Sequence, residues 1–178
     1  HAVLSVNGNV AALVPGEMVE LAEAVGADLE VNLFNRTEAR MAAIADHLRD
    51  HGASEVKGLT ADARIPGLDH ERAKVDADGI YDADVVVVPL EDGDRAAALS
   101  AMGKTEIVVD LNPLTRSAEA AAIPIVDNLV RVVPAMVDHA AVLRDRSTDE
   151  LERIVADFDA DEARTAAERR IRGGDLQG

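Results

Sequence analysis

Short apolar segments alternate along the chain with longer segments in which apolar residues recur at helical spacing. Residues 85–90, Val-Val-Val-Val-Pro-Leu, are apolar throughout, which is typical of a parallel strand buried on both faces. Strands that alternate with helices favour a parallel sheet joined by crossover helices. We therefore predict a doubly wound α/β fold, with a mostly parallel sheet and helices on both faces.

Six segments are predicted as strands and four as helices. The strands are residues 2–6, 29–34, 55–59, 85–90, 107–111 and 123–126. The helices are residues 15–25, 38–51, 96–102 and 128–143. Gly26 and Gly52 follow the first two helices, and glycine commonly ends a helix. Thr37 is a candidate N-cap for the second. Because residues 60–83 contain proline and glycine without clear periodicity, we expect an irregular segment that wraps around the outside.

Acidic residues outnumber basic residues by 34 to 18, which gives a net charge of −16. Such a chain repels itself at low salt, and this balance is typical of cytosolic proteins from salt-adapted, haloarchaeal organisms. Nucleic acid is an unsuitable partner for so acidic a protein. The chain has no cysteine, which excludes disulfides, thiolate nucleophiles and Cys-ligated zinc.

Three further expectations concern the localisation of the protein, the start of the chain and its division into domains. No apolar run approaches the roughly 20 residues that a membrane span needs, so we expect a cytoplasmic protein without a membrane partner. The chain starts at His1 inside an apolar strand and without a methionine, so we expect further sequence upstream. We predict a core domain over residues 1–143, and an acidic helix with a flexible tail over residues 144–178.

Candidate chemistry follows the strands, because ligands of open α/β sheets bind at the carboxyl ends of the strands. Asn7-Gly8-Asn9 follows the first strand, where glycine allows backbone N–H groups to approach an anion; a simple tight turn is the alternative. Asn32 and Arg36 follow the second strand. The Arg36 guanidinium could clamp a phosphate or carboxylate, or lie at the surface as an ordinary arginine.

Two later loops are richer in polar residues. Glu91, Asp92, Asp94 and Arg95 follow the most apolar strand, which suggests binding of Mg²⁺ or an amine; an ordinary acidic loop is the alternative. The loop after the next strand contains several hydrogen-bonding side chains, and two more end the following strand. These side chains are Asp110, Asn112, Thr115, Arg116 and Ser117, followed by Asp127 and Asn128. So many polar groups beside a buried strand indicate a binding site.

Other kinds of site are less well supported. His47 and His51 lie four residues apart on a predicted helix, a spacing that can bind metal, but charged neighbours favour a solvated face. The chain has no Gly-x-Gly-x-x-Gly and no Walker A lysine, which argues against a conventional dinucleotide or P-loop site. No serine lies in a nucleophile-elbow context, so acyl-enzyme chemistry has no candidate.

The motifs in these loops resemble those of the archaeal 4-phosphopantoate–β-alanine ligases, also called phosphopantothenate synthetases. They are Ser5-Val6-Asn7-Gly8-Asn9, Glu30-Val31-Asn32-Leu33-Phe34 with Arg36, Pro89-Leu90-Glu91-Asp92-Gly93-Asp94-Arg95, Asp110-Leu111-Asn112-Pro113-Leu114 with Arg116, and Ile125-Val126-Asp127-Asn128. The resemblance implies a Rossmann-like homodimer in coenzyme A biosynthesis. It would condense 4-phosphopantoate with β-alanine and convert ATP, as its Mg²⁺ complex, to AMP and pyrophosphate.

The resemblance also assigns roles to residues. The implied ATP contacts are Asp110, Leu111, Asn112, Arg116, Ser117, Asn128 and Leu129. Thr115-Arg116-Ser117 departs from the family's usual Ser-Arg-Thr but keeps both hydroxyls, and the family's N-terminal helical segment with further arginines is absent here. Adenylation needs positive charge and positioning rather than a nucleophile, which agrees with the missing cysteine and serine centres.

We hypothesise that Arg36, Arg95 and Asp94 take part in catalysis, the arginines by holding the substrate's phosphate or carboxylate. The expected substrate-binding residues are Asn7, Gly8, Asn9, Asn32, Glu91 and Asp92, with Glu91, Asp92 or Asp94 receiving the β-alanine ammonium or Mg²⁺. We expect no dedicated metal site. Two alternatives stay open: a non-catalytic nucleotide-binding regulatory module on the same fold, and a nicotinamide-dependent oxidoreductase.

Overall fold

A parallel five-stranded sheet forms the centre of the protein. The computed structural model describes residues 1–91 and 93–173. The sheet strands are β1 (Ala2–Val6), β2 (Asp28–Val31), β5 (Val85–Pro89), β6 (Thr105–Asp110) and β7 (Ile123–Val126). They lie in the order β2-β1-β5-β6-β7, and every neighbouring pair is parallel. The predicted doubly wound α/β class is confirmed.

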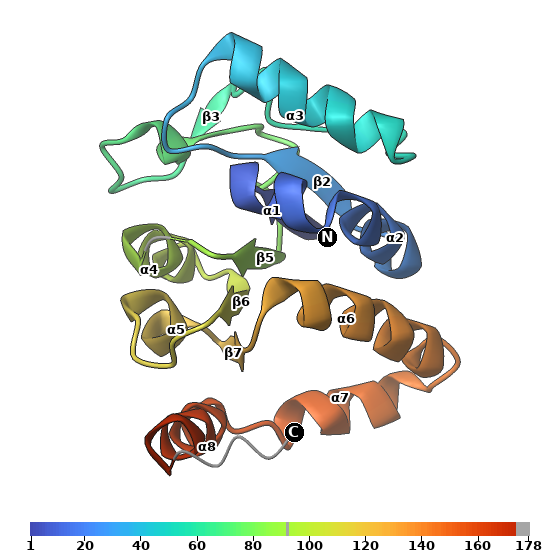
Figure 1. The fold of residues 1–178 in the computed structure, drawn as a ribbon, viewed down its shortest axis with the longest axis vertical. Helices are drawn as coiled ribbons and strands as arrows, with labels where there is room; N and C mark the ends of the chain where they lie inside the picture. Colours follow the sequence, from blue (N-terminus) through green and yellow to red (C-terminus); the bar gives the residue numbers. More distant parts are fainter. Residues whose placement is uncertain (92, 174–178) are drawn as a thin grey trace.

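Helices cover both faces of this sheet. They are α1 (Gly8–Leu13), α2 (Pro15–Val25), α3 (Glu38–Asp50), α4 (Gly93–Ala101), α5 (Arg116–Ala120), α6 (Leu129–Leu143), α7 (Thr148–Ala156) and α8 (Ala160–Gly173). Figure 1 shows α2 and α6 on one side of the strands and α4 and α5 on the other. A sheet whose strands are connected by helices on both of its faces is called doubly wound.

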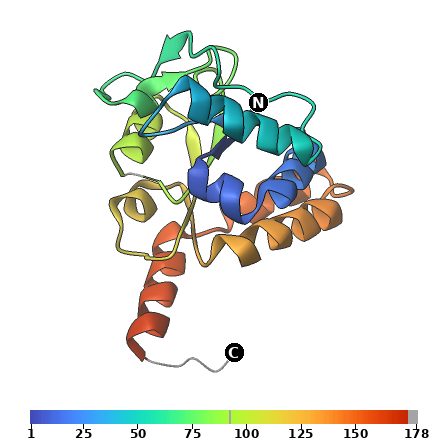
Figure 2. The ribbon, with the colours of Figure 1, turned by 45° about the horizontal axis from the view of Figure 1, so that its top comes forward.

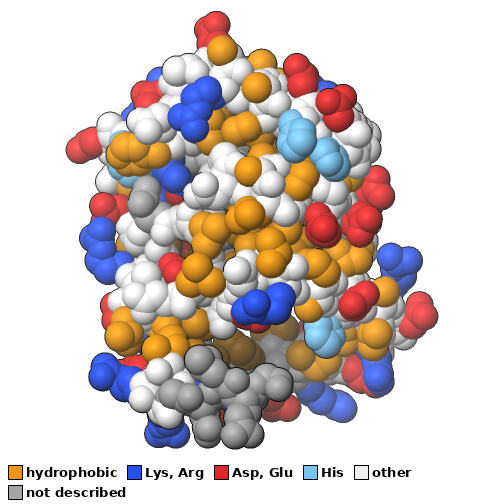
Figure 3. All heavy atoms as spheres, in the orientation of Figure 1, with side chains coloured by type: hydrophobic (Ala, Val, Ile, Leu, Met, Phe, Trp, Pro, Cys, Tyr) orange, Lys and Arg blue, Asp and Glu red, His pale blue; other side chains and the backbone are white. Residues whose placement is uncertain are grey.

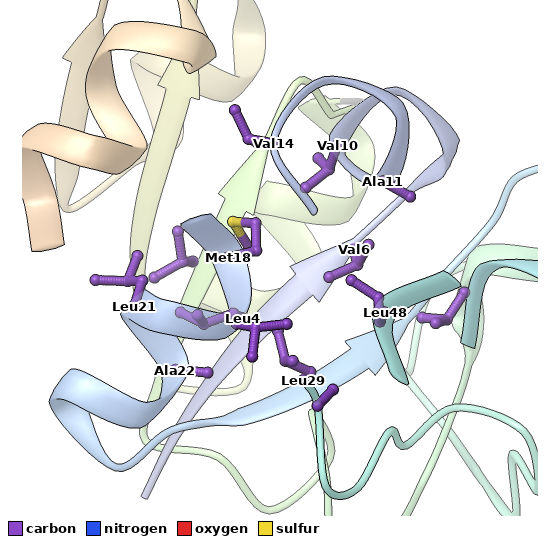
Figure 4. Packing of buried hydrophobic residues seen from close by; sticks show 14 of the residues in the cluster. Leu4, Val6, Val10, Ala11, Val14, Met18, Leu21, Ala22, Leu29 and Leu48 are labelled. Carbon is purple, nitrogen blue, oxygen red and sulfur yellow. The ribbon is translucent and has the colours of Figure 1, made fainter. Parts of the chain in front are cut away.

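The core on the first face joins β1 and β2 to α1, α2, α3 and α6. Leu4 and Val6 of β1 point to this face, where they pack with Met18 of α2 and Leu48 of α3 (Figure 4). All four side chains are at most 1% exposed. Alternate residues of a strand point to opposite faces, so Val3, which precedes Leu4, belongs to the second core.

The second core includes part of the chain that the sequence predicts as an outer, irregular segment. Residues 63–83 begin with a small antiparallel hairpin. Its strands are β3 (Ala63–Arg64) and β4 (Lys74–Val75), and the short helix η1 (Glu71–Ala73) lies between them. Ile65, Val75 and Ile80 of this segment are at most 1% exposed and pack against Val86 and Val88 of β5. The prediction that this segment only wraps the outside is therefore wrong.

The predicted strand at residues 55–59 is also wrong. Only Lys57 pairs there, in a single parallel bridge with Glu30 of β2. Gly58 then turns the chain with a φ of 93°, and a Cβ at this glycine would overlap the carbonyl oxygen of Val31. The close approach of the turn to β2 leaves no room for a longer strand.

The last part of the chain packs less than the rest. No residue of α7 is buried, and α8 lies against the edge strand β7. Figure 2 shows α8 extending away from the sheet. Hydrophobic side chains gather over α1 and α6 on the face drawn in Figure 3. Leu13 of α1 is 50% exposed and Val130 of α6 is 44% exposed. No helix of the described residues is long and apolar enough to cross a membrane.

A buried carboxyl group lies on β6. Glu106 is 1% exposed, and its Oε1 has no hydrogen-bond partner within residues 1–91 and 93–173. Burial raises the pKa of Glu106 from 4.5 to about 7. The folded state therefore binds more protons than the unfolded state between these two values. Stability consequently falls as the pH rises from about 4.5 through 7.

Replacing Glu106 by methionine should relieve this pH-dependent loss. Glu106→Met should have a higher free energy of unfolding than the native protein. We expect this gain to be roughly 2 kcal/mol larger at pH 8 than at pH 5, because burial penalises the ionised carboxylate. Urea unfolding at the two pH values measures the difference. The exposed Glu20 of α2 provides the control Glu20→Met. An equal effect of Glu106→Met at both pH values would contradict the burial argument.

Candidate functional site

The strand order identifies one place in the sheet where the chain changes direction. From β1 the chain moves outward to β2, and it then returns to β5 on the other side of β1. Ligands of open α/β sheets bind at the carboxyl ends of the strands that flank such a switch point. The residues at this position are Asn7 after β1, and Leu90 and Glu91 after β5. The site is therefore built around residues that the sequence also singles out.

Asn7 connects the two strands at the switch point. Its Nδ2 donates to the carbonyl oxygens of Pro89 (3.0 Å) and Leu90 (3.2 Å). Its Oδ1 accepts from the backbone N–H groups of Asn9 (2.9 Å) and Val10 (3.1 Å), which caps α1. Both donors and both lone pairs of this side-chain amide are thus in use. Asn7 holds the site together, while its contact with substrate stays a prediction.

Asn7→Ala should destabilise the protein by about 2–3 kcal/mol. The substitution removes a helix cap worth about 1 kcal/mol and leaves two carbonyl groups without their side-chain donor. Urea unfolding measures the loss. The control is Thr37→Ala, which removes only the cap of α3, where Thr37 accepts from the N–H of Arg40. If both variants lose the same stability, the bonds from Asn7 to β5 contribute nothing.

The backbone of Leu90 adopts a left-handed conformation with a φ of 51°. This conformation is strained for leucine, and such strain concentrates at functional sites. Asn7 and the N–H of Leu90, which donates to the carbonyl oxygen of Val109 (2.9 Å), hold the strained residue in place. The chain after β5 therefore turns sharply, and Glu91 enters the interior.

Glu91 lies between two arginines in a buried cluster. Its side chain is 1% exposed, and it forms ion pairs with Arg72 and with Arg95, whose Nη1 lies 2.8 Å from Glu91 Oε2. The same Arg95 nitrogen donates to Ser5 Oγ at 3.1 Å. Two arginines and one glutamate give a net charge of +1 at the end of the sheet. This charge suits an anion better than the amine expected at Glu91.

The cluster places one predicted site residue, Arg95, differently from the sequence prediction, and it adds an arginine that was not predicted. Arg95, expected to hold substrate, is 0% exposed and lies behind Glu91. Arg72, which the sequence analysis did not select, lies in η1 and lines the hollow in front. No sequence signal identifies Arg72, because it lies in a segment without periodicity and meets Glu91 only through the packing of that segment.

The hollow at the ends of β1 and β2 has a volume of about 170 Å³. Its lining residues are Asn7, Gly8, Asn9, Leu33, Phe34, Asn35, Arg40 and Arg72. Three predicted substrate-binding residues, Asn7, Gly8 and Asn9, are thus brought together with two guanidinium groups. Arginines beside a glycine backbone form a suitable environment for a phosphate or a carboxylate.

A second hollow of about 450 Å³ follows β2 and contains Arg36. Arg36 Nη2 donates to the carbonyl oxygen of Gly58 at 2.5 Å, while its Nη1 is buried without a hydrogen-bond partner in the described part of the chain. Lys74 lines the same hollow. Asn32 is fully buried, and its Nδ2 donates to the carbonyl oxygens of Arg72 (3.2 Å) and Lys74 (3.1 Å). Asn32 therefore supports both hollows from behind.

The loop after β6 is ordered by its own side chains. Asp110 accepts from the N–H of Asn112 (3.1 Å) and from Thr115 Oγ1 (2.8 Å), and Asn112 Oδ1 accepts from the N–H of Leu114 (3.0 Å). Thr115 also caps α5, a short helix that the sequence analysis did not predict. These bonds satisfy much of the polarity that the sequence analysis attributes to a ligand. They also leave Leu111 58% and Leu114 53% exposed.

The loops after β5 and β6 are in direct contact. Ser117 is buried, and its Oγ donates to the carbonyl oxygen of Glu91 at 2.7 Å. Arg116 Nη1 lies 2.6 Å from Asp94 Oδ1 in an exposed ion pair. A Cβ at Gly93 would overlap the Cβ of Arg116 and lie 3.2 Å from the Ser117 nitrogen. The sequence therefore needs glycine at position 93 for the two loops to meet.

The start of α6 lies next to the loop after β6, at the carboxyl end of β7. Asn128 caps the helix by accepting from the N–H of Val130 at 3.1 Å, and the N–H of Asp127 donates to the carbonyl oxygen of Asp110 at 3.1 Å. Leu129 is 1% exposed and belongs to the core, so only its backbone can reach a ligand. Asp127 forms an ion pair with Arg131, which holds the pKa of that carboxyl below its usual range.

The predicted site residues thus fall into two groups at the carboxyl ends of the strands. Asp94, Arg116 and Ser117 lie with the loop of Asp110, while Asn7, Gly8 and Asn9 lie with Arg72. Asp92, an expected substrate residue, lies outside the described residues. His47 and His51 lie on the exposed surface of α3. No cluster of three potential metal-ligating side chains occurs among the residues that the structure describes.

Comparison with known proteins identifies the family. A family model for phosphopantothenate/pantothenate synthetases matches residues 1–174. The chain belongs to this family. It is 58% identical over 160 residues to a 4-phosphopantoate–β-alanine ligase from Thermococcus kodakarensis, which covers 89% of this chain and 61% of the relative. It is 49% identical over 157 residues to the ligase of the same name from Methanosarcina mazei, which covers 88% of this chain and 62% of the relative.

Family membership agrees with the resemblance that the loop motifs indicate. The chain spans about three fifths of the length of the curated relatives it matches. The matched part nevertheless contains the whole sheet and every loop described above, because the family match runs through residue 174. Both groups of predicted site residues therefore lie within the part of the chain that matches the synthetase family.

Proposed function

We propose that the protein containing this chain is an ATP-dependent ligase that joins 4-phosphopantoate to β-alanine, in coenzyme A biosynthesis. A carboxylate oxygen of 4-phosphopantoate attacks the α-phosphorus of ATP, and pyrophosphate leaves. The amine of β-alanine then attacks the acyl carbon of the adenylate, loses a proton and releases AMP. The observation that carries this proposal is the family match over residues 1–174, together with two arginine-lined hollows at the carboxyl ends of β1 and β2.

ATP binds at the ends of β6 and β7. Asp110, Asn112 and Arg116 offer side chains there, because each is at least partly exposed. Leu111 offers an exposed apolar surface for the base, being 58% exposed. Ser117, Asn128 and Leu129 contribute backbone groups or caps, since the side chains of Ser117 and Leu129 are buried. The exposed Arg116 guanidinium stabilises negative charge on the phosphates.

The substrate anion binds at the ends of β1 and β2, beside Arg36 and Arg72. The hollow with Arg40 and Arg72 has no carboxylate among its described lining residues, whereas Arg36 and Lys74 share the second hollow with Glu38 and Glu71. The arginines of the two hollows support binding of a molecule with a phosphate at one end and a carboxylate at the other. Arg95 acts from behind, by holding Glu91 together with Arg72. Asp94 is the better candidate for the β-alanine ammonium, because its carboxylate is exposed whereas that of Glu91 is buried between arginines.

Mg²⁺ enters with the nucleotide. Mg²⁺ in such sites is held mainly by phosphate oxygens and water, with one or two protein carboxylates. Asp94, which is paired with Arg116, and Asp110, which accepts from Thr115, are the carboxylates that would be available to such an ion. When bound, the ion neutralises charge on the phosphates, and the protein residues position the reactants.

Replacing Arg36 tests the substrate assignment. In the complete protein, Arg36→Ala should raise the KM for 4-phosphopantoate by about 100-fold, because a charge-assisted contact to a phosphate is lost. The KM for ATP should stay unchanged. The exposed Arg49 of α3 gives the control Arg49→Ala. Equal kinetic constants for Arg36→Ala and the native protein would remove Arg36 from the site.

We also propose that the protein is a cytoplasmic, salt-adapted homodimer. The net charge of −16 supports adaptation to salt, and it predicts that thermal stability increases between 0.1 M and 2 M KCl. Sedimentation velocity of the complete protein in high salt tests the dimer.

A further inference from the structure

Arg36 is held by a loop whose conformation requires support from elsewhere. Residues 58–61 form this loop, and the carbonyl oxygen of Gly58 accepts from Arg36 Nη2 at 2.5 Å. Ala61 adopts a left-handed conformation with a φ of 50°, which is unfavourable for a residue with a side chain. Leu59, Thr60 and Ala61 line the hollow that contains Arg36. The position of Arg36 therefore depends on whatever holds this loop.

Asp76 holds both ends of the loop. Its side chain accepts two backbone hydrogen bonds, from the N–H of Gly58 to Oδ2 at 2.7 Å and from the N–H of Ala61 to Oδ1 at 2.5 Å. Asp76 is 8% exposed, so these bonds are shielded from water. Hydrogen bonds to a charged acceptor are about twice as strong as neutral ones. The carboxylate thus fixes Gly58, whose carbonyl oxygen accepts from Arg36.

Asp76 is positioned in turn by a second carboxyl group. Glu30 of β2 is 0% exposed, and it accepts from the N–H of Asp76 at 3.1 Å and from the N–H of Ile80 at 2.6 Å. A Cβ at Gly79 would overlap Glu30 Oε2, so the turn over residues 76–80 fits closely around this group. A continuous path of hydrogen bonds therefore links the sheet at Glu30, through Asp76, to the loop and Arg36.

We propose that Asp76 is a positioning residue of the ligase, which acts through the 58–61 loop to hold the Arg36 guanidinium where it binds the anionic substrate. This inference rests on the proposed function of Arg36. It explains why a buried aspartate lies beside the hollow with its two oxygens committed to backbone groups of one loop. Asp76 itself does not touch the substrate.

Anion binding tests this role independently of turnover. The probe is inorganic phosphate, titrated at constant ionic strength into the complete protein and monitored by calorimetry. Asp76→Asn replaces one acceptor with an NH₂ group that faces a backbone N–H, so we expect phosphate to bind about tenfold more weakly. The matched control is Asp159→Asn, because Asp159 also accepts from a backbone N–H, that of Glu162 at 2.9 Å, but lies at the start of α8. This control should bind phosphate as the native protein does.

A double-mutant cycle separates positioning from general damage. Combining Asp76→Asn with Arg36→Ala should weaken binding no further than Arg36→Ala alone, because Asp76 acts through Arg36. Independent, multiplying effects would overturn the proposal, as would native phosphate affinity in Asp76→Asn or no effect of Arg36→Ala. Asp76→Ser, which keeps one acceptor, serves in the same cycle if melting curves show that Asp76→Asn is unfolded.

Kinetics distinguish this inference from the function on which it rests. Asp76→Asn should raise the KM for 4-phosphopantoate about tenfold while kcat and the KM for ATP change less than about twofold. A purely structural role would lower the amount of active protein and leave the KM unchanged. If the native protein binds phosphate through Arg36 in a way that depends on Asp76 but forms no AMP, the ligase proposal fails while the positioning role stands.

Discussion

Gly93→Ala is expected to lower kcat for AMP formation by about 100-fold. The loop after β5 and the start of α5 meet at Gly93, where a Cβ would overlap the Cβ of Arg116 and lie 3.1 Å from its carbonyl carbon. Neither group is the end of a flexible side chain, so the two backbones must separate. A displacement of about 1 Å at a binding site can cost two orders of magnitude in rate. The variant should therefore displace Arg116 and Ser117, which we propose as nucleotide-binding residues.

Turnover and melting temperature of Gly93→Ala must be measured together. Overpacking also destabilises, and we expect a loss of about 1–3 kcal/mol. The control is Gly16→Ala in α2, where the added Cβ would meet only His51 Cδ2 at an ordinary 3.6 Å. That variant should keep native kinetics. Native kcat in a folded Gly93→Ala would show that the contact between the two loops has no part in catalysis.

Glu91→Gln is expected to reduce the free energy of unfolding by about 3–5 kcal/mol. Removing one partner of a buried ion pair leaves uncompensated charge, and here two guanidinium groups lose their shared carboxylate. Arg95 is fully buried and cannot turn to water without opening the end of the sheet. Chemical denaturation measures the loss.

Two comparisons define the result for Glu91. The exposed Glu119 of α5 provides the control Glu119→Gln, which should change stability by less than about 0.5 kcal/mol. Added phosphate should restore part of the lost stability of Glu91→Gln, because an anion can neutralise the arginines. A stability loss equal to that of Glu119→Gln would mean that the cluster of Arg72, Glu91 and Arg95 does not stabilise the end of the sheet.

Most strands of the sheet follow directly from the sequence. The run at residues 85–90 is apolar because β5 is buried on both faces, and the order of strands and helices determines the doubly wound class. Residues 55–59 show where this reasoning ends. Their pattern fits a strand, but Gly58 turns against Val31 and only Lys57 pairs with the sheet. That outcome depends on a tertiary approach that no local pattern reports.

The convergence of the polar loops was predictable, whereas the contacts of individual side chains were not. Polar residues that follow parallel strands are expected to meet at one end of the sheet, because the carboxyl ends of parallel strands lie together. Whether an arginine faces a ligand depends on packing between distant segments. Arg72 comes into the cluster with residues 63–83, and Arg95 is covered by it. Asn7 and Ser117 likewise bond to carbonyl groups of residues 89–91, far away in the sequence.

We propose that the carboxyl ends of these parallel strands form the active site of an AMP-forming ligase. The most direct test measures AMP release by the complete protein in high salt, with ATP, Mg²⁺, 4-phosphopantoate and β-alanine supplied together and with each omitted in turn. We predict one AMP and one pyrophosphate for each amide bond formed, and no steady AMP release without either 4-phosphopantoate or β-alanine. ATP binding without AMP release in the full mixture would contradict the account.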